Sequence, residues 1–336
     1  MVLFNNFKLL IRFITKVRAV NRENGQYHKL VKQIAAAEIR ASEAINDGSI
    51  EELHFLKIQW YMATNLYLGE LLAGLRPQKL TEKEKSSLVY LGALMAITDV
   101  MVDDIKVHPE RLNFLMKGSY EKLGKLSAIE QVFMLFYQKL LASVEKEKAG
   151  YIQDFSLRKP QLDSHGQINA KQTIGEIHEI TRKKGGTAVL LTASLLFPIT
   201  EKNRGVFYQL GAFIQYMNDS QDMYKDARAG IQTFISHYNT FDEINQKLGE
   251  EFEQTKVLLY ASDYAFNKVN EFLFYLHAMF VGIIFKNKEL TKRFGNSIEI
   301  EKLLLMKKAT FEIQMFSMRS IIFSAPKILS FKRPKC

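Results

Sequence analysis

Prolines are rare in this sequence and divide it into long uninterrupted segments. The six prolines in 336 residues stand at Pro77, Pro109, Pro160, Pro198, Pro326 and Pro334. Because proline interrupts helices, the segments between them have room for helices of many turns. Apolar residues recur within them three and four positions apart, as in Leu53, Leu56 and Trp60, and this spacing is typical of helices. Alternating apolar and polar residues bounded by hairpin turns are hard to find, so the sequence predicts an all-α fold.

Three of these segments are apolar on nearly every side: Tyr90–Ile97, Ala188–Ile199 and Leu273–Phe285. A helix of that kind belongs in the interior of a large bundle, surrounded by other helices. An apolar content of 47% excludes a disordered chain. The sequence therefore predicts a helical bundle with a sizeable core.

The number of cysteines and the length of the longest apolar run indicate the compartment in which the protein is expected. The one cysteine is Cys336, so a disulfide framework is excluded and a reducing, cytoplasmic location is expected. The longest nearly continuous apolar run is Phe272–Phe285, which is shorter than the roughly 18–20 residues of a spanning helix. Arg12 interrupts the first apolar stretch, and no secretory signal is evident. We therefore expect neither an integral membrane protein nor a secreted one.

The net charge of +10 is concentrated at the two ends of the chain. Residues 1–22 contain five basic and no acidic side chains, and residues 313–336 do so too, whereas residues 23–312 are electrically balanced. Basic residues interleaved with Phe, Leu and Ile favour contact with a membrane surface over binding of nucleic acid. We predict a basic amphipathic segment at 1–22, a single helical domain at 23–312 and a basic apolar tail at 313–336.

A first acidic cluster follows one of the most apolar segments. If Tyr90–Ile105 is a helix, Asp99 and Asp103 are four positions apart and share one face, with Asp104 next to them. Like charges at this spacing destabilise a helix. A solvated helix end is one interpretation, and a site for a divalent cation such as Mg²⁺, which prefers oxygen ligands, is the other.

A second acidic cluster presents a longer series of oxygen donors. Asn218, Asp222 and Asp226 are spaced at i, i+4 and i+8, so they lie along one face of a helix. The neighbouring charged residues are Asp219, Lys225 and Arg228. A solvated helix face would also produce this pattern, but a chelating series of this length favours metal binding.

These residues resemble the metal motifs of class I terpene synthases. Asn218-Asp219-x-x-Asp222-x-x-Lys225-Asp226 is similar to their second motif, N-D-x-x-S-x-x-K-E, with Asp222 in place of Ser and Asp226 in place of Glu. The first cluster resembles the aspartate-rich motif of the same superfamily. The segment Arg182–Gly186 resembles the stretch of cations and a helix break that precedes the second motif. The resemblance covers roughly residues 30–300.

The resemblance implies an isoprenoid-synthase-like bundle with a central active-site cavity, in which Mg²⁺ and a prenyl diphosphate bind. The metal ligands it implies are Asp99, Asp103, Asp104, Asn218, Asp219, Asp222 and Asp226. Asp99, Asp103 and Asp222 would be the catalytic residues, and the diphosphate would be bound by Arg182, Lys184, Lys225 and Arg228. Charge at a helix end before a glycine cap is the other interpretation of Arg182–Gly186.

The expected activity is that of a Mg²⁺-dependent terpene synthase, a carbon–oxygen lyase. Elongating prenyltransferases usually carry an Arg-Arg pair after the first motif, whereas this chain continues Ile105–Arg111 without one. Head-to-head condensation of the squalene or phytoene type and chain elongation remain alternatives. A catalytically inactive helical scaffold is a third, because of the two substitutions in the second motif.

The partners expected are a prenyl diphosphate and an anionic membrane, with no nucleic acid, and a homodimer is left open. Phe7, Leu10, Ile11, Ile14 and Val17 follow helical spacing beside Lys8, Arg12 and Lys16. This pattern suits an amphipathic helix in the plane of a membrane surface. Packing of the same stripe onto the bundle is the alternative.

Overall fold

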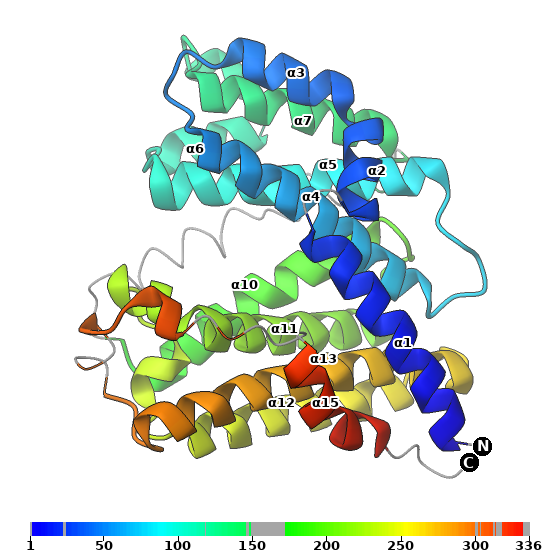
Figure 1. Cartoon of the computed structure of the whole chain (residues 1–336). Coiled ribbons are helices and arrows are strands. Elements are labelled where there is room, and N and C mark those ends of the chain that lie inside the picture. The colour runs from blue at the N-terminus through cyan, green and yellow to red at the C-terminus, as the bar shows by residue number, and fades with distance from the viewer. Residues whose placement is uncertain are drawn as a thin grey trace. The chain divides into compact units, whose positions relative to one another are not determined.

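The computed structural model describes residues 2–22, 25–117, 119–145, 148, 172–299, 302, 304–311, 313 and 318–331. Over these residues regular structure is helical, and an isolated β-bridge pairs Thr240 with Ser297. The longer helices are α1 (Val2–Asn21), α2 (Gln26–Ile34), α3 (Ala36–Ile45), α4 (Glu52–Ala73), α5 (Glu82–Asp99), α6 (Pro109–Lys117), α7 (Ala128–Ser143), α10 (Ile174–Ser194), α11 (Glu201–Arg228), α12 (Phe241–Tyr260), α13 (Phe266–Phe294) and α15 (Met318–Leu329). Shorter elements are η1 (Val100–Asp104), η2 (Tyr120–Lys122), η4 (Phe234–His237) and η5 (Lys308–Thr310). The prediction of an all-α fold is confirmed (Figure 1).

The chain forms two compact units. The first comprises Met1–Arg18, Gly166–Gly186 and Glu201–Cys336, and the second comprises Ala19–His165 and Thr187–Thr200. These boundaries differ from the predicted division at residues 22 and 312, which stays a prediction.

The core of the second unit is built on α5. This helix packs against α4 and α7, and its apolar residues from Leu88 to Ile97 are buried apart from the half-buried Met95, as the apolar pattern of Tyr90–Ile97 predicts. Thr81 caps the helix, because its hydroxyl accepts a hydrogen bond from the Glu84 backbone N–H at 3.2 Å. A capped start and an apolar body together place the acidic end of α5, at Asp99, at a defined position in the unit.

The core of the first unit lies among α11, α12 and α13. Phe213, Phe252 and Phe280 form an aromatic cluster, in which the Phe252 and Phe280 rings stack with centroids 5.2 Å apart. Offset or stacked aromatic pairs of this kind contribute about 0.5–1.5 kcal/mol beyond their buried area. This cluster fixes α11, and with it the second acidic cluster, against the rest of the unit.

Gly185 and Gly186 do not break α10, so the prediction of a helix break at Arg182–Gly186 is wrong. The helix continues without interruption from Ile174 to Ser194. A Cβ on Gly185 would lie 2.2 Å from the carbonyl oxygen of Gly211, and a Cβ on Gly211 would lie 2.1 Å from that of Gly185. The glycines therefore allow α10 and α11 to cross with their backbones in contact, rather than ending a helix.

In the part of the chain that the structure describes, two helical stretches are long and apolar enough to cross a membrane, Glu82–Asp104 and Phe266–Phe294. Within the protein 78% and 67% of their most apolar windows are buried. Core helices of soluble proteins share these properties, so length and composition here are weak evidence for a spanning segment.

Candidate functional site

The second acidic cluster turns a different face inward from the one predicted. Asp219 is buried and Asp222 and Asp226 are half-buried, whereas Asn218 is exposed. The residues whose charges act on one another are Asp219, Asp222 and Asp226, at i, i+3 and i+7 along α11. The predicted inclusion of Asn218 at i, i+4 and i+8 therefore does not describe the inward face.

Burial makes the charge on this face unfavourable. It raises the pKa of Asp226 to about 8, with further contributions from the charges of Asp219 and Asp222. It also raises the pKa of Asp219 to about 6, although Gln215, Lys184 and Thr181 act in the opposite direction. A nearby cation would relieve the cost of ionising these carboxyl groups together.

The crossing of α10 and α11 brings polar groups to Asp219. The Thr181 hydroxyl donates to Asp219 Oδ2 at 3.2 Å, and the Gln215 amide donates to Oδ1 at 2.8 Å. Lys184 contributes positive charge toward both Asp219 and Asp226. Thus α10 supplies part of the surroundings of the acidic face, and binding of a diphosphate by Lys184 stays a prediction.

Two further predicted diphosphate ligands lie at the end of α11. Lys225 Nζ is 4.0 Å from Asp222 Oδ2, and the lysine side chain is largely exposed. The exposed Arg228 guanidinium donates to the backbone carbonyl of Leu304 at 3.4 Å. Lys225 therefore lies beside the acidic face, where a ligand anion would need a cation.

Arg182 has a strong partner inside the protein. Its guanidinium donates to both carboxylate oxygens of Glu251, at 3.0 and 2.9 Å, and to Gln209 Oε1 at 2.5 Å. Burial by itself raises the pKa of Glu251. The net shift is nevertheless downward, because Lys247 and Gln209 donate hydrogen bonds to the carboxylate and the positive charges of Lys247 and Arg182 stabilise it. The contacts of Arg182 join α10, α11 and α12, and its binding of a diphosphate stays a prediction.

Lys286 is a buried cation that the sequence interpretation missed. It projects from α13, and its ammonium donates to the backbone carbonyl of Gln221 at 2.6 Å and to that of Ser220 at 3.4 Å. Burial lowers its pKa to about 8, while the charge of Asp222 acts to raise it. The signal in the sequence was a lysine directly after the apolar run that ends at Phe285.

The first acidic cluster lies in the second unit, where α5 passes into the π-helix η1. In η1 the Ile105 backbone N–H donates to the carbonyl of Val100, five residues earlier, at 2.9 Å. Lys57 of α4 bridges Asp99 Oδ2 at 2.7 Å and Asp104 Oδ2 at 3.2 Å. The π-turn thus pairs Asp99 with Asp104, whereas the predicted α-helical spacing pairs it with Asp103.

The Lys57 ammonium is a cation that faces this cluster. Burial by itself lowers the pKa of Lys57. The net shift is upward, because the charges and hydrogen bonds of Asp99 and Asp104 stabilise the ammonium. His54 Nε2 also lies 3.7 Å from Asp104 Oδ2. Two residues after η1, Lys106 has a φ of 58°, which is strained for a residue with a side chain.

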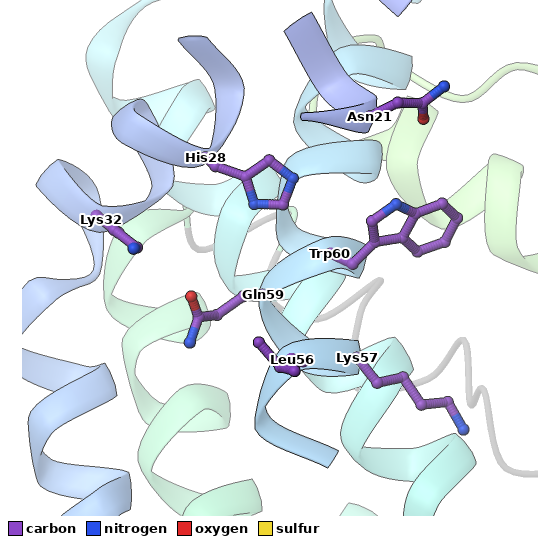
Figure 2. A pocket seen from close by; sticks show the side chains of 7 residues that line it. All are labelled: Asn21, His28, Lys32, Leu56, Lys57, Gln59 and Trp60. Carbon is purple, nitrogen blue, oxygen red and sulfur yellow. The ribbon is translucent and has the colours of Figure 1, made fainter. Parts of the chain in front are cut away.

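A pocket of about 360 Å³ lies beside this cluster in the second unit. Figure 2 shows its lining, which comes from the end of α1, from α2 and from α4: Asn21, His28, Lys32, Leu56, Lys57, Gln59 and Trp60. It combines apolar and aromatic surface with lysine side chains. No sequence pattern predicted it, because its wall depends on how α2 packs against α4.

The carboxylates of α11 have the donor chemistry that magnesium requires. Across the residues the structure describes, no group of three or more His, Cys, Asp or Glu side chains is arranged to hold a metal ion. Magnesium in substrate sites is commonly bound by one or two carboxylates together with waters and phosphate oxygens. The raised pKa values of Asp219 and Asp226 mark oxygen donors that a cation would stabilise, so these residues fit Mg²⁺. Because the two clusters belong to different units, their placement across one cavity stays a prediction.

No protein-family model matches the chain. No curated protein matches it either. Among solved structures, the chain is similar to a geranyltransferase from Legionella pneumophila, with a TM-score of 0.43 and 13% sequence identity. The match covers 80% of this chain and 99% of that one. Similarity at this level is too low to assign a family.

Proposed function

We propose that the chain is a Mg²⁺-dependent enzyme that ionises a prenyl diphosphate and forms a linear or cyclic terpene. The observation that carries this proposal is the inward face of α11, where Asp219, Asp222 and Asp226 lie beside the cations Lys184 and Lys225. Acidic and basic groups close together suit a ligand that contains both a divalent cation and an anion.

The chain's own residues would divide the work of binding. One or two carboxylates of the set Asp219, Asp222 and Asp226 would hold Mg²⁺ together with water and diphosphate oxygens, and Lys184 and Lys225 would donate to diphosphate oxygens. Bound Mg²⁺ would neutralise the diphosphate and stabilise it as a leaving group. The proposal gives Asp99, Asp103 and Asp104 the same type of role in the second unit.

The test is incubation of the purified chain with prenyl diphosphates of ten to thirty-five carbons and Mg²⁺. Released diphosphate and hydrocarbon products are both measured. We expect Asp222→Ala to lower diphosphate release about 100-fold or more while the fold is kept. Asp263→Ala, at an exposed aspartate of the same unit, is the matched control and should keep full activity. Undiminished release by folded Asp222→Ala would refute metal-assisted ionisation at this face.

The products separate this proposal from its enzymatic alternatives. A lyase or cyclase gives a hydrocarbon or alcohol from one prenyl diphosphate. Head-to-head condensation and elongation join two substrates, so their products contain the carbons of both.

An inactive scaffold is the second candidate. The observation that favours it is Lys57, whose ammonium lies between Asp99 and Asp104 at the position where a cation was expected. Absence of turnover with every prenyl diphosphate, in a chain shown to be folded by its circular dichroism, would support the scaffold.

A further inference from the structure

Helix α1 has two apolar faces, and the bundle covers one of them. Leu9, Leu10 and Phe13 are buried, and the Phe13 ring stacks on Tyr275 of α13 with centroids 6.1 Å apart. The opposite face leaves three large side chains in solvent, with exposed fractions of 61% for Phe4, 51% for Phe7 and 50% for Ile11. These three stand at i, i+3 and i+7, so they form one continuous stripe.

Helix α15 repeats this arrangement. Ile328 is buried, whereas Ile322 and Phe323 are 64% and 67% exposed. Among the described residues, three exposed side chains on α1 and two on α15 thus form apolar surface in the first unit.

The two helices are fixed to one another. Asn6 is fully buried, and its side-chain amide donates to the backbone carbonyls of Leu329 at 3.0 Å and Phe331 at 3.3 Å. In Figure 1 the N-terminal part of α1, in blue, lies near α15, in red. A buried amide that satisfies two carbonyls at the end of a helix holds both elements in place. We call the exposed apolar residues of these two helices together the terminal surface: Phe4, Phe7, Ile11, Ile322 and Phe323.

The two segments of the sequence that contain the terminal surface carry charged residues of a single sign. Residues 1–22 and 313–336 hold ten basic residues and no acidic one. Lys8 Nζ lies 4.5 Å from the centroid of the Phe4 ring, and Arg12 is largely exposed, 3.9 Å from Glu271 Oε1. Lys327 is exposed on α15. Exposed aromatic and aliphatic side chains with cations beside them match the boundary between acyl chains and anionic headgroups.

We propose that the terminal surface docks the protein on an anionic lipid bilayer. Phe4, Phe7 and Phe323 enter the headgroup boundary, and Lys8 and Lys327 contact lipid phosphates. The buried face of α1 remains on the bundle, so docking requires no unfolding. This inference does not depend on the proposed enzymatic activity.

The experiment is co-sedimentation of the full chain with vesicles of phosphatidylcholine alone or with about 30% phosphatidylserine, at about 0.1 M and about 0.5 M NaCl. Wild-type protein should sediment with the anionic vesicles at low salt, and binding should weaken at high salt. The Phe7→Glu/Phe323→Glu double variant should bind the anionic vesicles at least about tenfold more weakly than the wild type. Val257→Glu/Leu53→Glu replaces two other exposed apolar residues with the same charge change, and it should bind like the wild type.

Two outcomes would overturn the proposal. One is no sedimentation of the wild type with anionic vesicles at low salt. The other is equal binding by the two double variants, once circular dichroism and melting have shown both to be folded. If the wild type forms a dimer that Phe7→Glu/Phe323→Glu dissociates, and does not bind vesicles, the surface contacts a second copy and the lipid proposal is wrong.

Discussion

Burial disfavours the charged forms of Asp226 and Lys286, which lie in the same unit of the protein. The pKa of the aspartate is raised to about 8 and that of the lysine is lowered to about 8. Neither value follows from residue type, since the sequence shows only an aspartate on a helix and a lysine after an apolar run. The cost of such burial is what a bound cation or anion would offset.

Replacing Asp226 by Asn should change how stability depends on pH in the presence of a chelator. The folded-state pKa of about 8 lies above the ordinary value of 3.8, so the wild type loses stability as the pH rises between these values. The loss is at most about 1.4 kcal/mol per pH unit. Asn cannot ionise, so Asp226→Asn should become progressively more stable than the wild type up to about pH 8. Urea unfolding between about pH 5 and about pH 8.5 measures this difference.

The control for this variant is Asp263→Asn, at a largely exposed aspartate. Its stability should follow the wild-type curve at every pH. If Asp226→Asn also runs parallel to the wild type, the carboxyl group of Asp226 is ionised in the folded protein without penalty.

At the scale of the helix, residue spacing predicted which helices are buried or charged, but it did not predict local departures from α-helical geometry or contacts between helices. The apolar pattern predicted the buried α5, and the acidic pattern predicted that α11 carries a charged face. It could not predict the π-turn of η1, because a shift from i+4 to i+5 bonding leaves no periodic signal in five residues. Nor could it predict that Gly185 packs against Gly211, since that role depends on a partner helix distant in sequence. Lys57 was missed for the same reason.

The close crossing of α10 and α11 should be sensitive to a single methyl group. A Cβ on Gly211 meets backbone atoms of Gly185 and Gly186 at 2.1–2.8 Å, and neither can move without displacing its helix. Gly211→Ala should therefore lower the melting temperature by about 5 °C or more, since strain of this kind commonly exceeds about 2 kcal/mol. Differential scanning calorimetry measures the change.

The matched control lies on the same helix. Gly205 has open space around its Cβ position, so Gly205→Ala should be neutral or stabilise the protein by about 1 kcal/mol through helix propensity. Equal melting temperatures for the two alanine variants would show that the helices do not cross at Gly211.

At the scale of the whole molecule, the net positive charge is confined to two segments of the sequence. The ten excess basic residues lie at the chain ends, while residues 23–312 are balanced. Composition and run length could locate this division from sequence. They could not show that α1 is covered on one face and exposed on the other, because amphipathic spacing does not reveal how many faces find a partner. Packing of the N-terminal stripe onto the bundle holds for Leu10 and Val17, which are buried, whereas Phe7 and Ile11 are exposed and their contact with a membrane stays a prediction.

Mg²⁺ with inorganic diphosphate should stabilise the whole chain against heat. A ligand at about 100 times its dissociation constant adds about 2.7 kcal/mol, which corresponds to a rise of several degrees in melting temperature. Asp222→Ala should lose this rise, whereas Asp263→Ala should keep it. Thermal unfolding with each component alone and with both together measures the effect without requiring turnover. A rise of the same size in Asp222→Ala would place the ligand away from the α11 face.

The hydrogen bonds of Asn6 to Leu329 and Phe331 have a practical consequence for handling the protein. They bring Asn6 next to residues 323 and 325 positions later in the sequence. An affinity tag or fluorescent reporter fused at the N-terminus is therefore attached within a few residues of Phe4 and Phe7. Fusions to this protein should be removed by a protease before its surface properties are compared.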